Sequence, residues 1–152
     1  MPELVVAVDV AASPQVVFDA ATDWGRHGEW MLGTSVAPVS LDGAGVGAEL
    51  AAWTGLGPLG FLDTMEITEW APPWRCVVRH TGAVVRGAGA FEVEPLPDGG
   101  CRFVWSEWLL VPFGLAGNLG FLAVRGVARA GLRHSLKSFA RWVEADLDHP
   151  YP

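Results

Sequence analysis

The chain has 152 residues, of which 51% are hydrophobic, with eight tryptophans and a formal net charge of −7 at pH 7. This length fits a single domain over residues 1–152 that buries about 70% of its unfolded surface without disulfide bonds. The negative net charge argues against a general nucleic-acid-binding protein.

The chain begins with a predicted strand and two short predicted helices. The strand covers Leu4–Val10, and Ser13 is a favourable N-cap for a first helix over Pro14–Ala21. A second short helical segment is predicted over Trp24–Met31, with Asp23 as its cap. We expect the two helices to form a V-shaped cradle.

The middle of the chain shows only strand and turn patterns. The predicted strands cover residues 35–41, 47–53, 61–70, 74–81, 84–94 and 101–111. The run Pro97-Asp98-Gly99-Gly100 predicts the turn of a hairpin between the last two strands. Because a parallel sheet needs a crossover helix for each pair of strands, these strands are expected to form one antiparallel sheet.

A long amphipathic helix is predicted from about Phe121 to Asp146. Its apolar stripe has steps of three and four residues and consists of Phe121, Val124, Ala128, Leu132, Leu136, Phe139 and Val143. A basic stripe from Arg125 to Arg141 repeats every four residues on another side, at Arg125, Arg129, Arg133, Lys137 and Arg141. This basic stripe predicts either a solvated face paired with the acidic N-terminal segments or a surface for an anionic partner or lipid.

The predicted fold class is therefore α+β, with a seven-stranded antiparallel sheet wrapped around the long C-terminal helix. Such an arrangement tends to leave a space between the sheet and the helix, which favours a container for a small molecule. The longest apolar run, residues 109–124, is interrupted by Pro112 and Asn118 and is shorter than the roughly 20 residues of a membrane-spanning helix. We therefore expect no transmembrane segment.

The strand faces can be assigned from their charged residues, because alternate residues of a strand face opposite sides. Placing the arginines in water puts Trp74, Cys76 and Val78 on the inner face, which is largely apolar. Its three polar exceptions are Asp63, His80 and Glu107. Glu107 or His80 is expected either to orient a ligand or to form an internal pair or a hydrogen bond to the long helix. The candidate ligand-binding residues are Trp30, Asp63, Met65, Val78, His80, Phe91, Phe103, Trp105, Glu107, Phe113 and Phe121.

Several other features have a structural and a functional interpretation. Gly87 and Gly89 on the inner face predict either a bend of the sheet or room for a ligand. Residues 113–121, which contain three glycines, are expected to form the gate of the cavity. Trp108 is predicted on the outer face, where it would support a homodimer or a membrane contact. The motif over residues 55–60 matches G-x-G-x-x-G, but it lacks the following helix of a dinucleotide site and is expected to be a mobile loop.

No cofactor or metal is expected from the sequence. The four histidines, His27, His80, His134 and His149, are scattered, and neither a zinc-binding H-E-x-x-H motif nor a phosphate-binding loop is present. The chain also lacks the G-x-S-x-G motif of serine hydrolases. With only two cysteines and no signal peptide, the chain is expected to be cytoplasmic.

Four segments carry a family resemblance: Val8–Phe18, Asp23–Trp30, the bend at Glu69–Arg75, and the hairpin from Phe91 to Phe103. In these segments the chain resembles the START-like (SRPBCC) superfamily, and within it the bacterial polyketide cyclase/dehydrase and lipid-transport group. The resemblance spans nearly the whole chain and implies the helix-grip fold. It carries no catalytic residue over, because the family has no universal one.

Three functions are compatible with this sequence. The leading one is binding of a hydrophobic small molecule such as a lipid or polyketide in the cavity between sheet and helix, with transport of that molecule as a further role. The second is a polyketide aromatase/cyclase, for which Glu107 and His80 are the only acid/base candidates. The third is a protein-interaction module that uses the basic stripe or Trp108.

Overall fold

The computed structural model describes residues 3–83, 85–110 and 114–148, and it contains one seven-stranded sheet, two α-helices and two short 3₁₀ helices within those residues. The strands are β1 (Glu3–Val10), β2 (Thr34–Pro38), β3 (Glu49–Leu56), β4 (Leu59–Ala71), β5 (Arg75–His80), β6 (Gly87–Pro95) and β7 (Cys101–Leu109). The helices are α1 (Pro14–Ala21), η1 (Trp24–Glu29), η2 (Leu41–Gly43) and α2 (Gly114–Asp148). The predicted α+β class and seven strands are confirmed.

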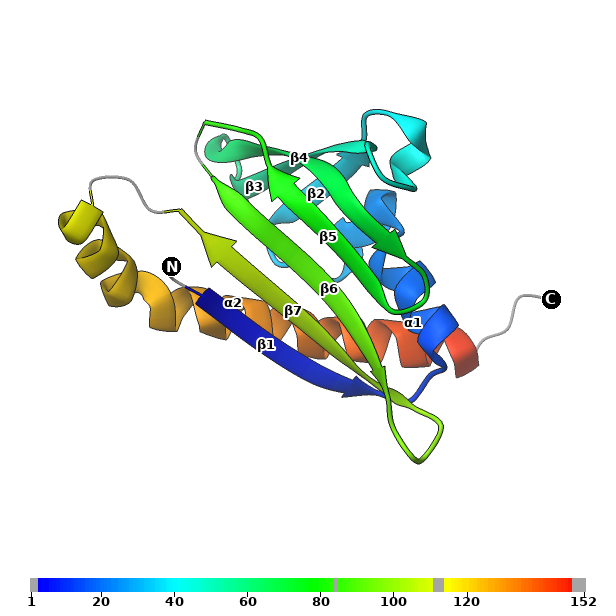
Figure 1. Ribbon diagram of the computed structural model, residues 1–152. Coiled ribbons are helices and arrows are strands. Elements are labelled where there is room, and N and C mark those ends of the chain that lie inside the picture. The colour runs from blue at the N-terminus through cyan, green and yellow to red at the C-terminus, as the bar shows by residue number, and fades with distance from the viewer. Residues whose placement is uncertain (1–2, 84, 111–113, 149–152) are drawn as a thin grey trace.

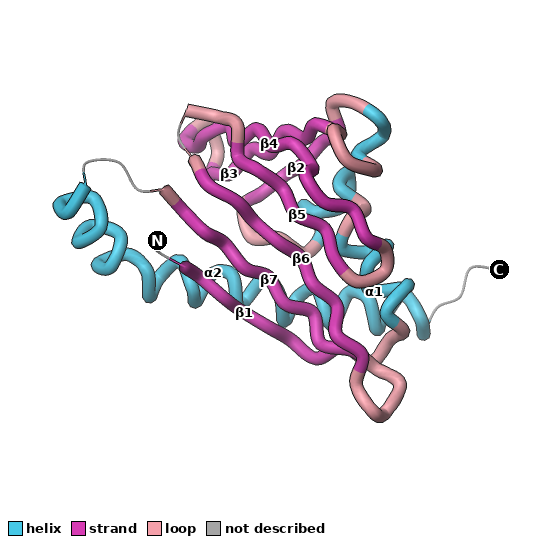
Figure 2. The backbone as a smooth tube through the Cα atoms, in the orientation of Figure 1, coloured by secondary structure: helices cyan, strands magenta, loops and turns pink. Residues whose placement is uncertain are grey.

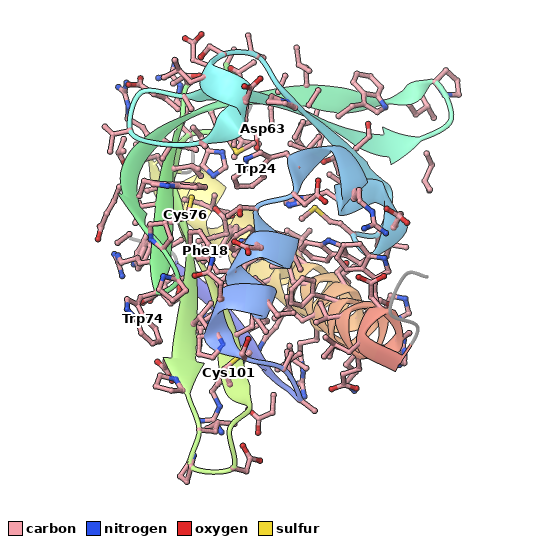
Figure 3. The ribbon with its side chains drawn as sticks, turned by 90° about the vertical axis from the view of Figure 1, so that its right-hand side faces the viewer. Phe18, Trp24, Asp63, Trp74, Cys76 and Cys101 are labelled. Atoms are coloured by element: carbon pink, nitrogen blue, oxygen red, sulfur yellow. The ribbon has the colours of Figure 1, made fainter. Side chains whose placement is uncertain are left out.

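All neighbouring strands are antiparallel, in the order β1-β7-β6-β5-β4-β3-β2. β1 therefore pairs with the last strand, which places the two ends of the strand region at one edge next to α2 (Figure 1). The tube view shows the strands running side by side with α2 crossing behind them (Figure 2). The sheet curls, so that α1, η1 and α2 lie in its hollow (Figure 3).

The two short helices form as the sequence predicts, although the second is a 3₁₀ helix. Ser13 caps α1 by accepting a hydrogen bond from the backbone N–H of Val16, at 3.4 Å. Asp23 caps η1 only through its backbone carbonyl, which accepts from the N–H of Arg26. η1 is anchored instead by Trp24, whose indole N–H donates to the carbonyl of Gly43 at 2.7 Å.

The core lies between the sheet and the second half of α2. Phe103, Leu136 and Phe139 are fully buried there, and the rings of Phe103 and Phe139 are 4.7 Å apart. Phe18 of α1 joins this core and packs edge-on against Trp70 of β4. The C-terminal half of the predicted apolar stripe is therefore buried as expected.

The first half of α2 differs from the prediction. The helix begins at Gly114, seven residues earlier than predicted, and its first turns project past the sheet (Figure 1). Val124 is 57% exposed and Leu122 is 59% exposed. A 35-residue helix is about 52 Å long, whereas a nine-residue strand such as β7 spans only about 30 Å, so β7 cannot run beneath the whole length of α2.

The β3–β4 hairpin also differs from its prediction. Residues 55–60 were expected to form a mobile loop, but both strands continue through them and pair Leu56 with Leu59. Only Gly57 and Pro58 form the turn, and Gly57 has a φ of +58°, which glycine adopts without strain. The G-x-G-x-x-G pattern thus belongs to a tight hairpin.

Candidate functional site: a charged triad in an apolar cavity

A cavity of about 410 Å³ lies between the concave face of the sheet and the helices. Its wall includes residues of η1, of strands β3 to β7 and of the middle of α2. Leu32 and Ala128, which line the cavity and are also exposed, place its mouth between α2 and the segment that follows η1. The volume is within the range of small-molecule sites in proteins.

The wall of the cavity is mostly apolar and aromatic. The ring of Phe91 lies perpendicular to the ring of Trp105 at 5.4 Å and is stacked on Trp24 at 6.2 Å. Aliphatic side chains complete the surface, among them Met65 of β4 and Val78 of β5. A ligand that enters this space would exchange water for apolar contacts, which is favourable.

Three charged side chains form a continuous hydrogen-bonded triad on this wall. His80 of β5 contacts Asp63 of β4, with 3.0 Å between Nδ1 and Oδ1. Its other ring nitrogen, Nε2, lies 2.9 Å from Oε2 of Glu107 on β7. The indole N–H of Trp105 donates to the remaining oxygen of Glu107, Oε1, at 2.8 Å.

The triad holds His80 in its protonated form. Burial opposes the charge on the imidazole, but the hydrogen bonds and negative charges of Asp63 and Glu107 outweigh it and raise the pKa of His80 to about 9. At pH 7 the imidazolium therefore donates one N–H to each carboxylate. Both carboxylates keep a small contact with the cavity, since their side chains are 12% and 14% exposed.

The bond between His80 and Glu107 spans an intervening strand, because β6 lies between β5 and β7. Gly89 of β6 is directly opposite Glu107 in the sheet. A Cβ atom at residue 89 would lie only 2.8 Å from Oε1 of Glu107. The missing side chain of Gly89 thus makes the room that lets Glu107 reach His80, and the carboxylate of Glu107 occupies that room.

The structure brings seven of the predicted site residues together on the cavity wall: Asp63, Met65, Val78, His80, Phe91, Trp105 and Glu107. Trp30 and Phe103 do not line the cavity, because both are buried in the core, where the ring of Phe139 contacts each of them. Phe121 is partly exposed on α2 and also does not line it. Phe113, and with it the start of the predicted gate, lies outside the described residues, and residues 114–121 belong to α2.

The prediction that Trp74 lies on the inner face of the sheet is wrong. The alternation along β5 predicted it on the inner face together with Cys76, Val78 and His80. It lies before the strand begins, is 48% exposed and points away from the interior (Figure 3). Asp63 and Trp24, in contrast, point toward the hollow in the same view.

His27 is a cavity residue that sequence reasoning did not select. It belongs to η1, is 1% exposed, and its Nε2 donates to the carbonyl of Ala21 at 2.7 Å. Burial lowers the pKa of His27 to about 4, and the hydrogen bond to Ala21 only partly opposes this. The aromatic spacing Trp24, His27, Trp30 is the one signal that groups it with the interior, where its ring contacts both tryptophans.

The two cysteines are buried and unpaired. Burial raises the pKa of the Cys76 thiol to about 12 and that of Cys101 to about 11. Both thiols are therefore neutral at pH 7 and poor nucleophiles. The cytoplasmic location stays a prediction.

The basic stripe of α2 lies on the surface. Arg129, Arg133, Lys137 and Arg141 are exposed, whereas Arg125 is half-buried. Among the described residues, none of the seven ion pairs includes a member of this stripe, so the predicted pairing with acidic N-terminal segments is absent there.

The described residues contain neither a metal-binding cluster nor a membrane-spanning helix. No group of three or more His, Cys, Asp or Glu side chains in residues 3–83, 85–110 and 114–148 has a geometry that could hold a metal ion. In that part of the chain, no helix combines the length and hydropathy needed to cross a bilayer.

Comparison with known proteins identifies a family over most of the chain. A family model described as polyketide cyclase/dehydrase and lipid transport matches residues 1–144. No curated protein sequence matches the chain.

Among solved structures, the aromatase/cyclase Zhui from Streptomyces sp. R1128 has a TM-score of 0.77 at 12% identity, over 96% of this chain and 95% of its own. A START superfamily protein from Mycobacterium smegmatis has a TM-score of 0.74 at 16% identity, over 94% and 97%. The Aha1 dimer from Colwellia psychrerythraea has a TM-score of 0.66 at 16% identity, over 95% and 97%. At these identities the likeness establishes the fold.

Proposed function

The chain belongs to the polyketide cyclase/dehydrase and lipid-transport family, and from this premise we propose that it binds an apolar small molecule in the cavity between its sheet and α2. The observation that carries the proposal is the cavity itself, with a volume of about 410 Å³ and a wall made mainly of aromatic and aliphatic side chains. Affinity would come from apolar burial, at about 25 cal/mol per Å², less the cost of ordering the ligand.

The test is a titration with the uncharged fluorescent probe N-phenyl-1-naphthylamine. The substitution Gly131→Phe places a ring at a cavity-lining position of α2 where an added Cβ meets open space. Gly126→Phe is the matched control, because Gly126 lies on the same helix, also has open space around it, and does not line the cavity. Both substitutions replace a helical glycine, so neither should lower the helix stability.

We expect one probe per chain in the wild-type protein and in Gly126→Phe, with binding weakened about tenfold or more in Gly131→Phe. Thermal melting of all three proteins establishes that the loss does not come from unfolding. No saturable binding by the wild-type protein, or equal binding by both variants, would overturn the proposal.

The aromatase/cyclase alternative is less well supported by the geometry. Its acid/base candidates, Glu107 and His80, are bonded to each other, and both ring nitrogens of His80 are already committed to carboxylates. Proton transfer to or from a substrate would have to break one of these bonds. A carrier returns its ligand unchanged, so the mass of a recovered poly-ketone ligand distinguishes the two functions.

The interaction-module alternative and a homodimer stay predictions. Trp108 is on the outer face as expected but is only partly exposed. If Trp108→Ser changed the size-exclusion volume of the protein, the homodimer would gain support.

A further inference from the structure

The charges of the cavity wall do not balance. Asp63 and Glu107 supply two carboxylates, and His80 supplies one imidazolium. None of the described arginines and lysines lines the cavity. His27, the other imidazole on the wall, is buried among aromatic rings and is neutral at pH 7. The wall thus carries a net charge of one negative unit in a largely apolar environment.

The N–H donors of His80 and Trp105 are already used. Both N–H groups of His80 bond carboxylates, and the indole N–H of Trp105 bonds Glu107. Of the two oxygens of Asp63, Oδ1 bonds His80, and within the described chain no donor reaches the other. The triad therefore presents unfilled acceptor sites to the cavity and no free charged donor.

The other polar side chains of the wall are neutral, and they include the hydroxyls of Thr34, Thr54 and Ser135. Thr34 donates to the carbonyl of Leu32 and lies 3.4 Å from the hydroxyl of Thr54. Ser135 of α2 accepts a hydrogen bond from the N–H of Leu32 at 3.0 Å. Such groups can bond an alcohol, but they cannot compensate the charge of a carboxylate that has left water.

We propose that the cavity selects apolar ligands whose polar end donates hydrogen bonds, a protonated amine before a hydroxyl, and that it rejects free carboxylates such as fatty-acid anions. The inference rests on the proposed function, because it concerns the ligand of the same cavity. An ammonium group beside Asp63 and Glu107 neutralises the excess negative charge, and the faces of Phe91 and Trp105 attract a cation as well. A carboxylate at the same place would face two like charges without a partner.

The experiment compares three ligands that share a naphthyl group and differ in the polar end. They are the amine 2-(1-naphthyl)ethylamine, the alcohol 2-(1-naphthyl)ethanol and the carboxylate 1-naphthaleneacetate. Calorimetric titration at pH 7 and low salt should rank the amine first, the alcohol second and the carboxylate last. We expect the carboxylate to bind about tenfold or more weakly than the alcohol, since an unpaired buried charge is costly.

Glu107→Gln is the diagnostic variant, because it keeps the shape of the side chain and removes one negative charge from the triad. It should reduce the preference for the amine over the carboxylate by about tenfold. Glu66→Gln is the control, since Glu66 pairs with Arg79 on the outer face of β4 and does not line the cavity. If Glu107→Gln does not fold, Asp63→Asn provides a second test, because it should also reduce the preference for the amine over the carboxylate.

The possible results distinguish the ligand selectivity of the cavity from its proposed function in binding an apolar molecule. If the uncharged probe N-phenyl-1-naphthylamine binds but the carboxylate ligand binds as tightly as the amine ligand, the selectivity is overturned and the proposed function stands. An unchanged preference in both Glu107→Gln and Asp63→Asn also overturns it. If neither the probe nor any of the three ligands binds, the proposed function fails and the selectivity fails with it.

Discussion

The triad makes the stability of the fold depend on pH in a specific direction. Below pH 6.5 the imidazole of His80 is protonated in both the folded and the unfolded chain, so the full stabilisation by its carboxylate partners is present. Between pH 6.5 and about 9 the folded chain keeps this proton and the unfolded chain loses it. The free energy of unfolding must therefore fall as the pH rises through this window.

The magnitude follows from the same values. A rise of the His80 pKa from 6.5 to about 9 corresponds to roughly 3 kcal/mol, and contact of the triad with water in the cavity makes this an upper bound. The slope approaches about 1.4 kcal/mol per pH unit in the middle of the window, as for one proton. Urea unfolding at pH 6, 7, 8 and 8.5 measures the free energy of unfolding and therefore this slope.

The comparison protein is His80→Gln, which has no group that titrates at this position. Cys76 and Cys101 add a further loss of stability above about pH 8.5, because their thiols ionise in the unfolded chain and stay neutral in the folded one. This contribution is the same in both proteins and cancels in the difference of slopes. A wild-type slope equal to that of His80→Gln between pH 6.5 and 8.5 would refute the charged triad.

Three other predictions follow from the contacts. Gly89→Ala should displace the opposite carboxylate from His80 and lower the pKa of His80, measured by NMR titration of the ring C–H resonances. His27, whose folded pKa is about 4, should make the fold lose stability as the pH falls from 6.5 to 4, by up to about 3 kcal/mol, and His27→Gln should flatten this limb in urea unfolding. Phe139→Ala should cost about 3–5 kcal/mol in the same assay, whereas Leu122→Ala, at a position 59% exposed, should cost less than about 0.5 kcal/mol.

Each of these predictions has a result that would contradict it. For Gly89→Ala the control is Gly126→Ala on α2, where an added Cβ meets open space, and an equal His80 pKa in the two variants would show that the room beside Gly89 is not needed. If the His27→Gln protein lost as much stability between pH 6.5 and pH 4 as the wild type, the loss would come from groups other than His27. Equal losses for Phe139→Ala and Leu122→Ala would mean that the core is not where the structure places it.

Much of the fold could be predicted because its signals are local. The Pro97–Gly100 turn and the alternation along β7 set the inner face that carries Trp105 and Glu107. Ser13 and the apolar pattern after it likewise locate α1. Trp74 was misplaced because alternation was extended beyond the first residue of β5, into a turn where it no longer holds.

The errors concern lengths and distant contacts. The apolar pattern of α2 predicts a buried stripe along its whole length, but how far the sheet extends beneath the helix is a property of the assembled fold, and Val124 lies beyond it. In the same way, nothing local indicates that Gly89 makes room for a carboxylate from the next strand. His27 was missed because its burial depends on packing of η1 against distant aromatic rings.

The triad shows what a sequence can and cannot say about a site. The strand faces identified Asp63, His80 and Glu107 as the polar exceptions on an apolar face, and the internal pair that was one of the two alternatives is present. That all three form one hydrogen-bonded chain across β4, β5 and β7 depends on sheet order and register, which the sequence did not determine. Their role toward a ligand stays a prediction.

The most direct test of the central proposal is to locate a bound probe by NMR. Intermolecular contacts of N-phenyl-1-naphthylamine with the ring protons of His80, Trp105 and Phe91 are predicted, because these side chains lie on the cavity wall. The exposed apolar side chains of α2, such as Leu119 and Leu122, offer the competing site. Contacts confined to Leu119 and Leu122, with no change at His80, would contradict binding in the cavity.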